Sequence, residues 1–172
     1  MRVAFFTFGV LREPTGHPRT KGFEDRIADS FAEAAASPGF IGYPRETYVR
    51  PDNPNVVWPE VKGPDREAMM TLSLWVDLES VFAFAYALRG VHNEALKLRK
   101  EWFLKPEWPN YVAWWVEDDH LPTWPEAIER HAYLSEHGST PFAFDFHLPF
   151  DAEGRPTKVL RRPIPLDLSP RG

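Results

Sequence analysis

Two places in the sequence hold side chains that could move a proton. His92 follows Gly90, which interrupts a helical pattern, and Asp118, Asp119 and His120 stand together after an apolar run. A carboxylate beside an imidazole can act as a general acid/base pair or supply ligands to a cation. The structural alternatives are that His92 bonds a backbone carbonyl and that the second group is a solvated, helix-capping loop. The candidate catalytic residues are His92, Asp119 and His120.

The residues that could hold a substrate are mostly aromatic. The hydroxyls of Tyr86 and Tyr111 could orient a substrate or bind a developing oxyanion, and core packing is the alternative. Adjacent strand residues point to opposite faces, so either Trp114 or Trp115 faces the open side of a sheet and could line a cavity. Alternatively both pack, one in the core and one at a dimer seam. The candidate binding residues are Tyr86, Arg99, Trp102, Phe103, Tyr111, Trp114 and Trp115.

Helical spacing also places a cation near one of the imidazoles. His92, Leu96, Arg99 and Phe103 form one row on a helix, so the His92 ring could face a cavity with Arg99 nearby. His131 is expected to be a satisfied interface histidine rather than a ligand. His137 and His147 lie at the ends of predicted elements, with no other candidate residues around them.

Several kinds of chemistry are disfavoured by what the sequence lacks. The absence of cysteine excludes thiol nucleophiles, thiolate zinc sites and iron–sulfur clusters. The ten glycines form neither a Gly-x-Gly-x-x-Gly nor a Gly-x-Ser-x-Gly pattern, which argues against nucleotide cofactors and serine hydrolases. No His-Glu-x-x-His or His-x-His spacing supports a metal. We therefore predict no metal and no cofactor.

Proline placement shows where the elements that position these residues lie, because proline is excluded from helix interiors and central strands. The stretch between Pro64 and Pro106 has none and predicts a strand over 69–75, a helix capped by Asp77 and a second helical run after Gly90. The other expected elements are strands at 3–8, 40–49, 111–116 and 143–147, and helices at 23–34 and 124–137, the last beginning with a capping box at Thr123.

This order predicts an α+β fold of the ferredoxin-like, split β-α-β type with an antiparallel sheet. The strand at 111–116 is strongly apolar and is expected to be central, and 51–64 is expected to be a loop. Two helices cover only one face of such a sheet, so face-to-face dimerisation is one way to cover the other. We expect one domain over 1–150, with the helix at 124–137 as an addition, and a proline-rich extended arm over 151–172.

Length and charge limit the setting in which the chain works. A chain of 172 residues with 43% hydrophobic residues suits a single core. The formal net charge of −5 argues against nucleic-acid binding. The start, Met1-Arg2-Val3, has no long apolar run, so we expect no signal peptide, no membrane span and a cytoplasmic location.

A set of motifs resembles the bacterial family called domain of unknown function 3291. The most specific are a Glu-Trp-Phe helix end at 101–103 and a Trp-Trp strand at 114–115. The family looks like a branch of the dimeric α/β-barrel superfamily, which includes cofactor-free monooxygenases, small isomerases and cyclases, and haem-binding or haem-degrading proteins. The segments that carry the resemblance are 8–12, 37–40, 74–75, 82–86, His92, 99–103, 111–116, 120–123 and 137–150.

Three functional hypotheses follow. The first is a homodimer that binds a small apolar or aromatic molecule and acts on it without a cofactor, as a monooxygenase, isomerase or cyclase does. The second, implied by the resemblance, is haem or tetrapyrrole binding with His92 as the iron ligand. The third is a non-catalytic dimeric ligand-binding or interaction protein, in which the Trp-rich face is only an interface.

Overall fold

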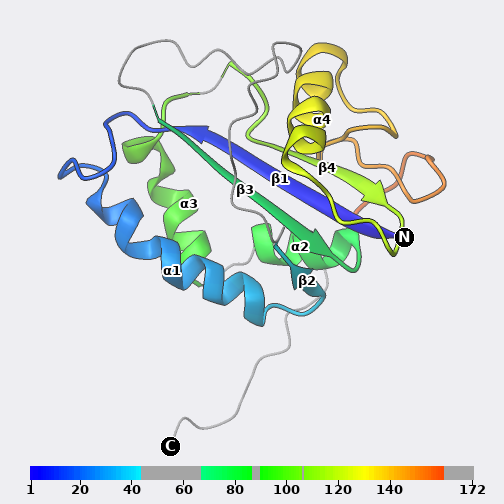
Figure 1. Cartoon of the computed structure of the whole chain (residues 1–172), viewed down its shortest axis with the longest axis horizontal. Coiled ribbons are helices and arrows are strands. Elements are labelled where there is room, and N and C mark those ends of the chain that lie inside the picture. Colours follow the sequence, from blue (N-terminus) through cyan, green and yellow to red (C-terminus); the bar gives the residue numbers. More distant parts are fainter. Residues whose placement is uncertain (44–66, 87–89, 106, 161–172) are drawn as a thin grey trace, which may run out of the picture.

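The described part of the chain forms one antiparallel sheet and four helices (Figure 1). The computed structural model describes residues 1–43, 67–86, 90–105 and 107–160. The expected loop at 51–64 and most of the expected strand at 40–49 lie outside these residues, as does the last part of the arm. The elements are β1 (Arg2–Val10), α1 (Lys21–Ala36), β2 (Phe40–Gly42), β3 (Ala68–Trp75), α2 (Leu78–Ala85), α3 (Val91–Trp102), β4 (Tyr111–Val116) and α4 (Trp124–His137).

The strand order is β2-β3-β1-β4, with antiparallel pairing throughout. The prediction that 111–116 is a central strand is wrong, because β4 is the last strand of this order. Its outer edge is covered instead by residue Phe144, which exchanges backbone hydrogen bonds of 2.8 and 3.0 Å with Ala113. The strand is apolar because both of its faces are buried. The strand expected at 143–147 is reduced to this isolated bridge.

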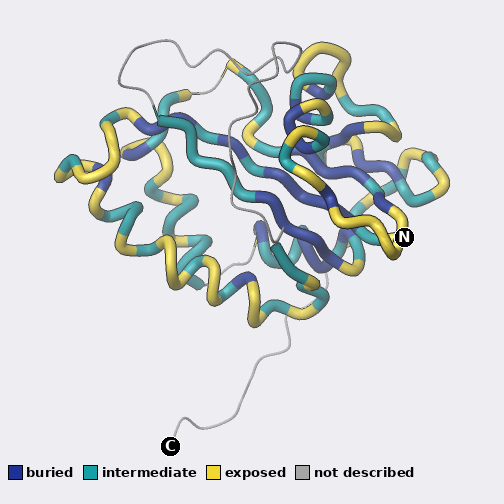
Figure 2. Tube along the Cα trace, in the orientation of Figure 1, coloured by how far each residue is buried: buried dark blue, intermediate teal, exposed yellow. Residues whose placement is uncertain are grey.

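Each face of the sheet carries its own core. Alternate residues of β1 divide between the two: Val3 and Phe5 pack with α1 and α2, whereas Ala4 and Phe6 pack with α4. The sheet is accordingly buried along most of its strands (Figure 2). We call these the α1/α2 face and the α4 face. Figure 1 shows α4 lying apart from the other three helices.

The expectation that one sheet face would be bare is corrected by α4. This helix begins with the predicted capping box, in which the Thr123 side chain accepts from the Glu126 backbone N–H, and it ends before Gly138. Its residues Ala127 and Leu134 are buried against the α4 face. The chain thus covers with its own helix the face for which dimerisation was one predicted cover.

Two of the other helices begin where the sequence predicts, whereas α1 is longer than the expected 23–34 at both ends. Asp77 caps α2 by accepting a hydrogen bond of 2.8 Å from the Ser80 N–H. The apolar residues of α1 are only partly buried, because Ile27 and Phe31 are exposed while Ala34 is enclosed. No helix in the described part of the chain is long and apolar enough to cross a membrane.

The first ten residues of the expected C-terminal arm turn back on the domain. Asp151 accepts backbone hydrogen bonds from Glu153 and Arg155 and also pairs with the Arg155 side chain at 2.9 Å. Beyond this turn, Thr157 donates to the Pro149 carbonyl at 2.9 Å. Val159 then packs on the α1/α2 face. Residues 151–160 are therefore a folded return rather than an extended segment.

Candidate functional site

The structure brings two of the predicted binding residues into direct contact. Tyr86 stands at the C-cap of α2 and Tyr111 is the first residue of β4. Their hydroxyl oxygens lie 3.1 Å apart. The Tyr111 oxygen also accepts a hydrogen bond of 3.3 Å from the Phe146 backbone N–H. Tyr86 is 48% exposed, so the pair joins a partly buried backbone donor to the surface.

Three phenylalanine rings complete the surroundings of this pair. The five residues Phe5, Phe82, Tyr86, Tyr111 and Phe146, here called the aromatic cluster, come from β1, α2, β4 and the segment after α4. Their contacting ring centroids lie 4.7–6.0 Å apart. Such distances are typical of favourable aromatic packing. The cluster runs from the buried Phe5 to the exposed Tyr86, on the α1/α2 face.

The environment keeps the Tyr111 phenol protonated. Burial is the main cause that raises its pKa, and the hydrogen bond with Tyr86 acts in the same direction. The negative charge of Asp145 raises this pKa further. At neutral pH the Tyr111 hydroxyl is therefore a hydrogen-bond donor and not a phenolate.

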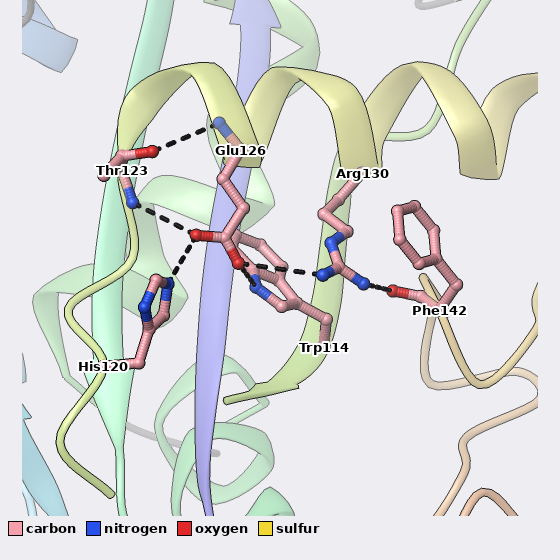
Figure 3. A network of polar contacts seen from close by, with 6 residues as sticks. All are labelled: Trp114, His120, Thr123, Glu126, Arg130 and Phe142. Atoms are coloured by element: carbon pink, nitrogen blue, oxygen red, sulfur yellow. Dashed lines mark hydrogen bonds and ion pairs between the residues drawn. The ribbon is translucent and has the colours of Figure 1, made fainter. Parts of the chain in front are cut away.

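A second polar group lies on the α4 face and centres on Glu126 (Figure 3). One carboxylate oxygen accepts from the Trp114 indole N–H at 2.7 Å, and the other lies 2.7 Å from His120 Nε2. Arg130 lies 3.8 Å from Oε1. Its guanidinium also donates to the Phe142 carbonyl and lies 3.6 Å from the centroid of that ring. Glu126 is thus a hub that ties α4 to β4.

This hub orients the His120 ring. Because a carboxylate only accepts hydrogen bonds, Nε2 of His120 is the donor in this contact. Asp118 and Asp119 do not join this arrangement. Asp118 instead pairs with the Met1 amino group at 3.1 Å, and Asp119 is exposed. His120 therefore pairs with Glu126 and not with the adjacent carboxylates that the sequence suggested.

His92 lies elsewhere. Its backbone N–H donates to Glu33 at 2.8 Å, and its ring packs on Phe84 with centroids 4.5 Å apart. Phe84 in turn stacks on Trp75, on the α1/α2 face. The His92 Nδ1 is buried and has no hydrogen-bond partner among the described residues. Burial lowers the pKa of this imidazole, against the opposing effect of the Glu33 charge. The sheet separates His92 from His120, so the candidate catalytic residues do not share one site.

The remaining candidate binding residues are also dispersed. Trp114 is fully buried on the α4 face, whereas Trp115 belongs to the α1/α2 face and donates its indole N–H to the Phe150 carbonyl at 2.8 Å. Trp102 and Phe103 pack on Phe23, at the end of α3. On the same helix Arg99 is exposed and bonds the Leu96 carbonyl at 2.7 Å. Tyr86 and Tyr111 are the pair with hydroxyls that the fold assembles.

His131 is a satisfied residue of the chain's own core, rather than the interface histidine that the sequence suggested. It is 1% exposed, and its Nε2 lies 2.6 Å from the Pro109 carbonyl. The ring packs against Phe6 and Phe8, and burial lowers its pKa. His137 lies 3.7 Å from Glu136, and His147 is exposed.

Sequence reasoning did not single out several members of these two groups. Glu126 entered only through the capping box at Thr123, although its position six residues after His120 is a usable signal. Phe82 and Phe146 entered only as parts of the segments 82–86 and 143–147. Nothing in the spacing of these phenylalanines predicts that they meet Tyr111, because the contacts join distant elements. In the described residues, no three His, Asp or Glu side chains gather where they could hold a metal.

Comparison with known proteins places the chain in a family. No curated protein and no solved structure matches it. The family model described as Domain of unknown function (DUF3291) matches residues 2–160, which covers both the aromatic cluster and the Glu126 hub. The chain therefore belongs to the DUF3291 family.

Proposed function

We propose that this chain binds a small apolar or aromatic molecule at the aromatic cluster and acts on it without a cofactor, as a monooxygenase, isomerase or cyclase does. The proposal includes a ferredoxin-like fold, of the kind found in dimeric α/β barrels. The strand order β2-β3-β1-β4 and the element order support that fold. It also includes a homodimer.

The observation that carries the proposal is a pair of hydroxyls at the exposed end of a ring cluster. Small-molecule sites combine many apolar and aromatic contacts with a few polar groups that fix orientation. The aromatic cluster has this composition: Phe5, Phe82 and Phe146 supply apolar surface, and Tyr86 and Tyr111 supply the polar groups. The aromatic cluster lies on the α1/α2 face, so α4, which covers the opposite face, does not cover the proposed site.

Saturation-transfer NMR with indole tests this site. We expect indole signals with the wild-type chain, and loss of those signals in Tyr86→Ala, because Tyr86 is the exposed member of the cluster. Phe31→Ala is the matched control, since Phe31 is a 40% exposed ring outside the cluster. Indole signals that survive Tyr86→Ala contradict the proposed site.

The contacts of His92 give the haem alternative no support beyond the resemblance. An axial ligand must hold one ring nitrogen toward open space on the side where the macrocycle lies. The His92 ring lies against Phe84, and its enclosed Nδ1 does not meet this requirement. We therefore assign no step of the proposed function to haem.

A further inference from the structure

We propose that the ligand of the aromatic cluster carries a neutral carbonyl oxygen, and that the Tyr86 hydroxyl donates a hydrogen bond to it. This inference rests on the proposed function and specifies the class of molecule that the same site takes. It follows from which way the hydrogen bonds run through Phe146, Tyr111 and Tyr86.

The direction of these hydrogen bonds follows from the donor at the Phe146 end. A phenol oxygen can accept two hydrogen bonds and donate one. The Phe146 N–H donates to the Tyr111 oxygen, so that contact uses one of its lone pairs. The proton of Tyr111 still needs an acceptor, and in the described part of the chain the neighbouring side-chain oxygen is that of Tyr86, at 3.1 Å.

Donation from Tyr111 to Tyr86 gives the Tyr111 proton an acceptor. Tyr111 is the more buried phenol, whereas Tyr86 is 48% exposed and can direct its own proton outward. The reverse direction would leave the Tyr111 proton without an acceptor among the residues that the structure describes, which is unfavourable for a half-buried hydroxyl. The hydrogen bonds therefore run from Phe146 to Tyr111 to Tyr86. Each bond polarises the next, so the Tyr86 proton is a strengthened donor.

The charge near the site selects a neutral acceptor. Asp145 precedes Phe146 and acts electrostatically on Tyr111. Its carboxylate is anchored by the Ser139 hydroxyl at 3.2 Å and by the His147 backbone N–H at 2.9 Å. A fixed negative charge beside the pair disfavours a ligand carboxylate. An aromatic ketone or aldehyde matches both the rings and the outward donor.

Affinities of three naphthalene probes test the inference: 2-acetylnaphthalene, 2-ethylnaphthalene and 2-naphthoate. The first two differ in shape by little more than the exchange of a carbonyl for a methylene. Their dissociation constants are measured by probe fluorescence with the wild-type chain, Tyr86→Phe and the control Tyr133→Phe, whose ring is on α4. Each probe is compared with itself between variants. Differences in hydration between the probes therefore do not affect the comparison.

We expect Tyr86→Phe to weaken 2-acetylnaphthalene about fivefold, which is the usual net effect of one neutral hydrogen bond, and to leave 2-ethylnaphthalene within about twofold. Tyr133→Phe should change neither, and 2-naphthoate should bind the wild-type chain more weakly than the ketone. Equal effects of Tyr86→Phe on ketone and hydrocarbon overturn this inference while leaving the proposed site intact. Preferential binding of 2-naphthoate also overturns it. Failure of all three probes to bind overturns both proposals.

Discussion

At the scale of single residues, the Glu126 carboxylate holds the α4 face together. It accepts from a fully buried indole, bonds the His120 ring and lies near the Arg130 guanidinium. A buried donor that loses its acceptor costs more than the hydrogen bond itself contributed. The Trp114 N–H is the group at risk, because it is 0% exposed and water cannot replace the carboxylate without local opening.

Glu126→Gln should therefore lower the free energy of unfolding by about 1 to 3 kcal/mol. The amide keeps one acceptor oxygen, which cannot serve both Trp114 and His120. Urea unfolding followed by tryptophan fluorescence measures the change. Glu129→Gln, an exposed position on the same helix, is the control and should change stability by less than about 0.5 kcal/mol. Equal stability of the two variants would show that the hub contributes nothing measurable.

The buried His131 makes stability depend on pH. Burial lowers its pKa in the folded state, so the unfolded chain binds more protons once the pH falls below the ordinary value of 6.5. The stabilisation is complete above about pH 6.5 and is lost as the pH falls toward the lowered folded-state pKa. We expect a smaller free energy of unfolding at pH 5.5 than at pH 7.5. In His131→Gln, whose amide can still donate to Pro109, the difference between the two pH values should shrink. An unchanged difference would exclude His131 as its source.

At the scale of elements, the start of α3 depends on a glycine and a carboxylate from another helix. Gly90 has a φ of +110°, a conformation that residues with a Cβ rarely adopt. A Cβ built there would lie 1.7 Å from the Glu33 carboxylate oxygen, and the same carboxylate binds the His92 backbone N–H at the start of α3. Helix packing and backbone conformation are thus coupled at this position.

Gly90→Ala should destabilise the fold by more than Gly16→Ala. Both glycines have positive φ, at +110° and +87°, so both substitutions introduce backbone strain of about 1 kcal/mol or more. A Cβ at Gly16 would have no neighbour within 4 Å, so its substitution adds no steric clash. Thermal unfolding followed by circular dichroism gives the comparison. Equal losses of thermal stability would mean that Glu33 moves away at no cost.

At the scale of the whole molecule, a sheet covered on both faces changes how a dimer can form. The α4 face is closed by Ala127 and Leu134, so two sheets cannot meet directly while α4 stays in place. The homodimer therefore remains a prediction whose contact surface includes α4 or lies elsewhere.

Native mass spectrometry tests that prediction, with an expected mass of twice 19.9 kDa. Hydrogen exchange at α4 then distinguishes the two surfaces. Exchange that slows with rising protein concentration places α4 in the contact. A monomer at all concentrations would remove the dimer from the proposed function.

The sequence alone determined the local structure, because capping, helical spacing and strand patterns depend on residues near one another. Asp77, the capping box at Thr123 and the break at Gly90 all lie where they were predicted. It also singled out Tyr86, Tyr111 and His120, since their side chains are the ones able to do chemistry. Which of them meet was decided by tertiary structure. Tyr86 and Tyr111 are 25 residues apart and join through packing, whereas His92 and His120 are separated by the sheet. Long-range contacts of this kind depend on how the helices pack on the two faces of the sheet. The spacing of residues near one another in the sequence does not determine that packing.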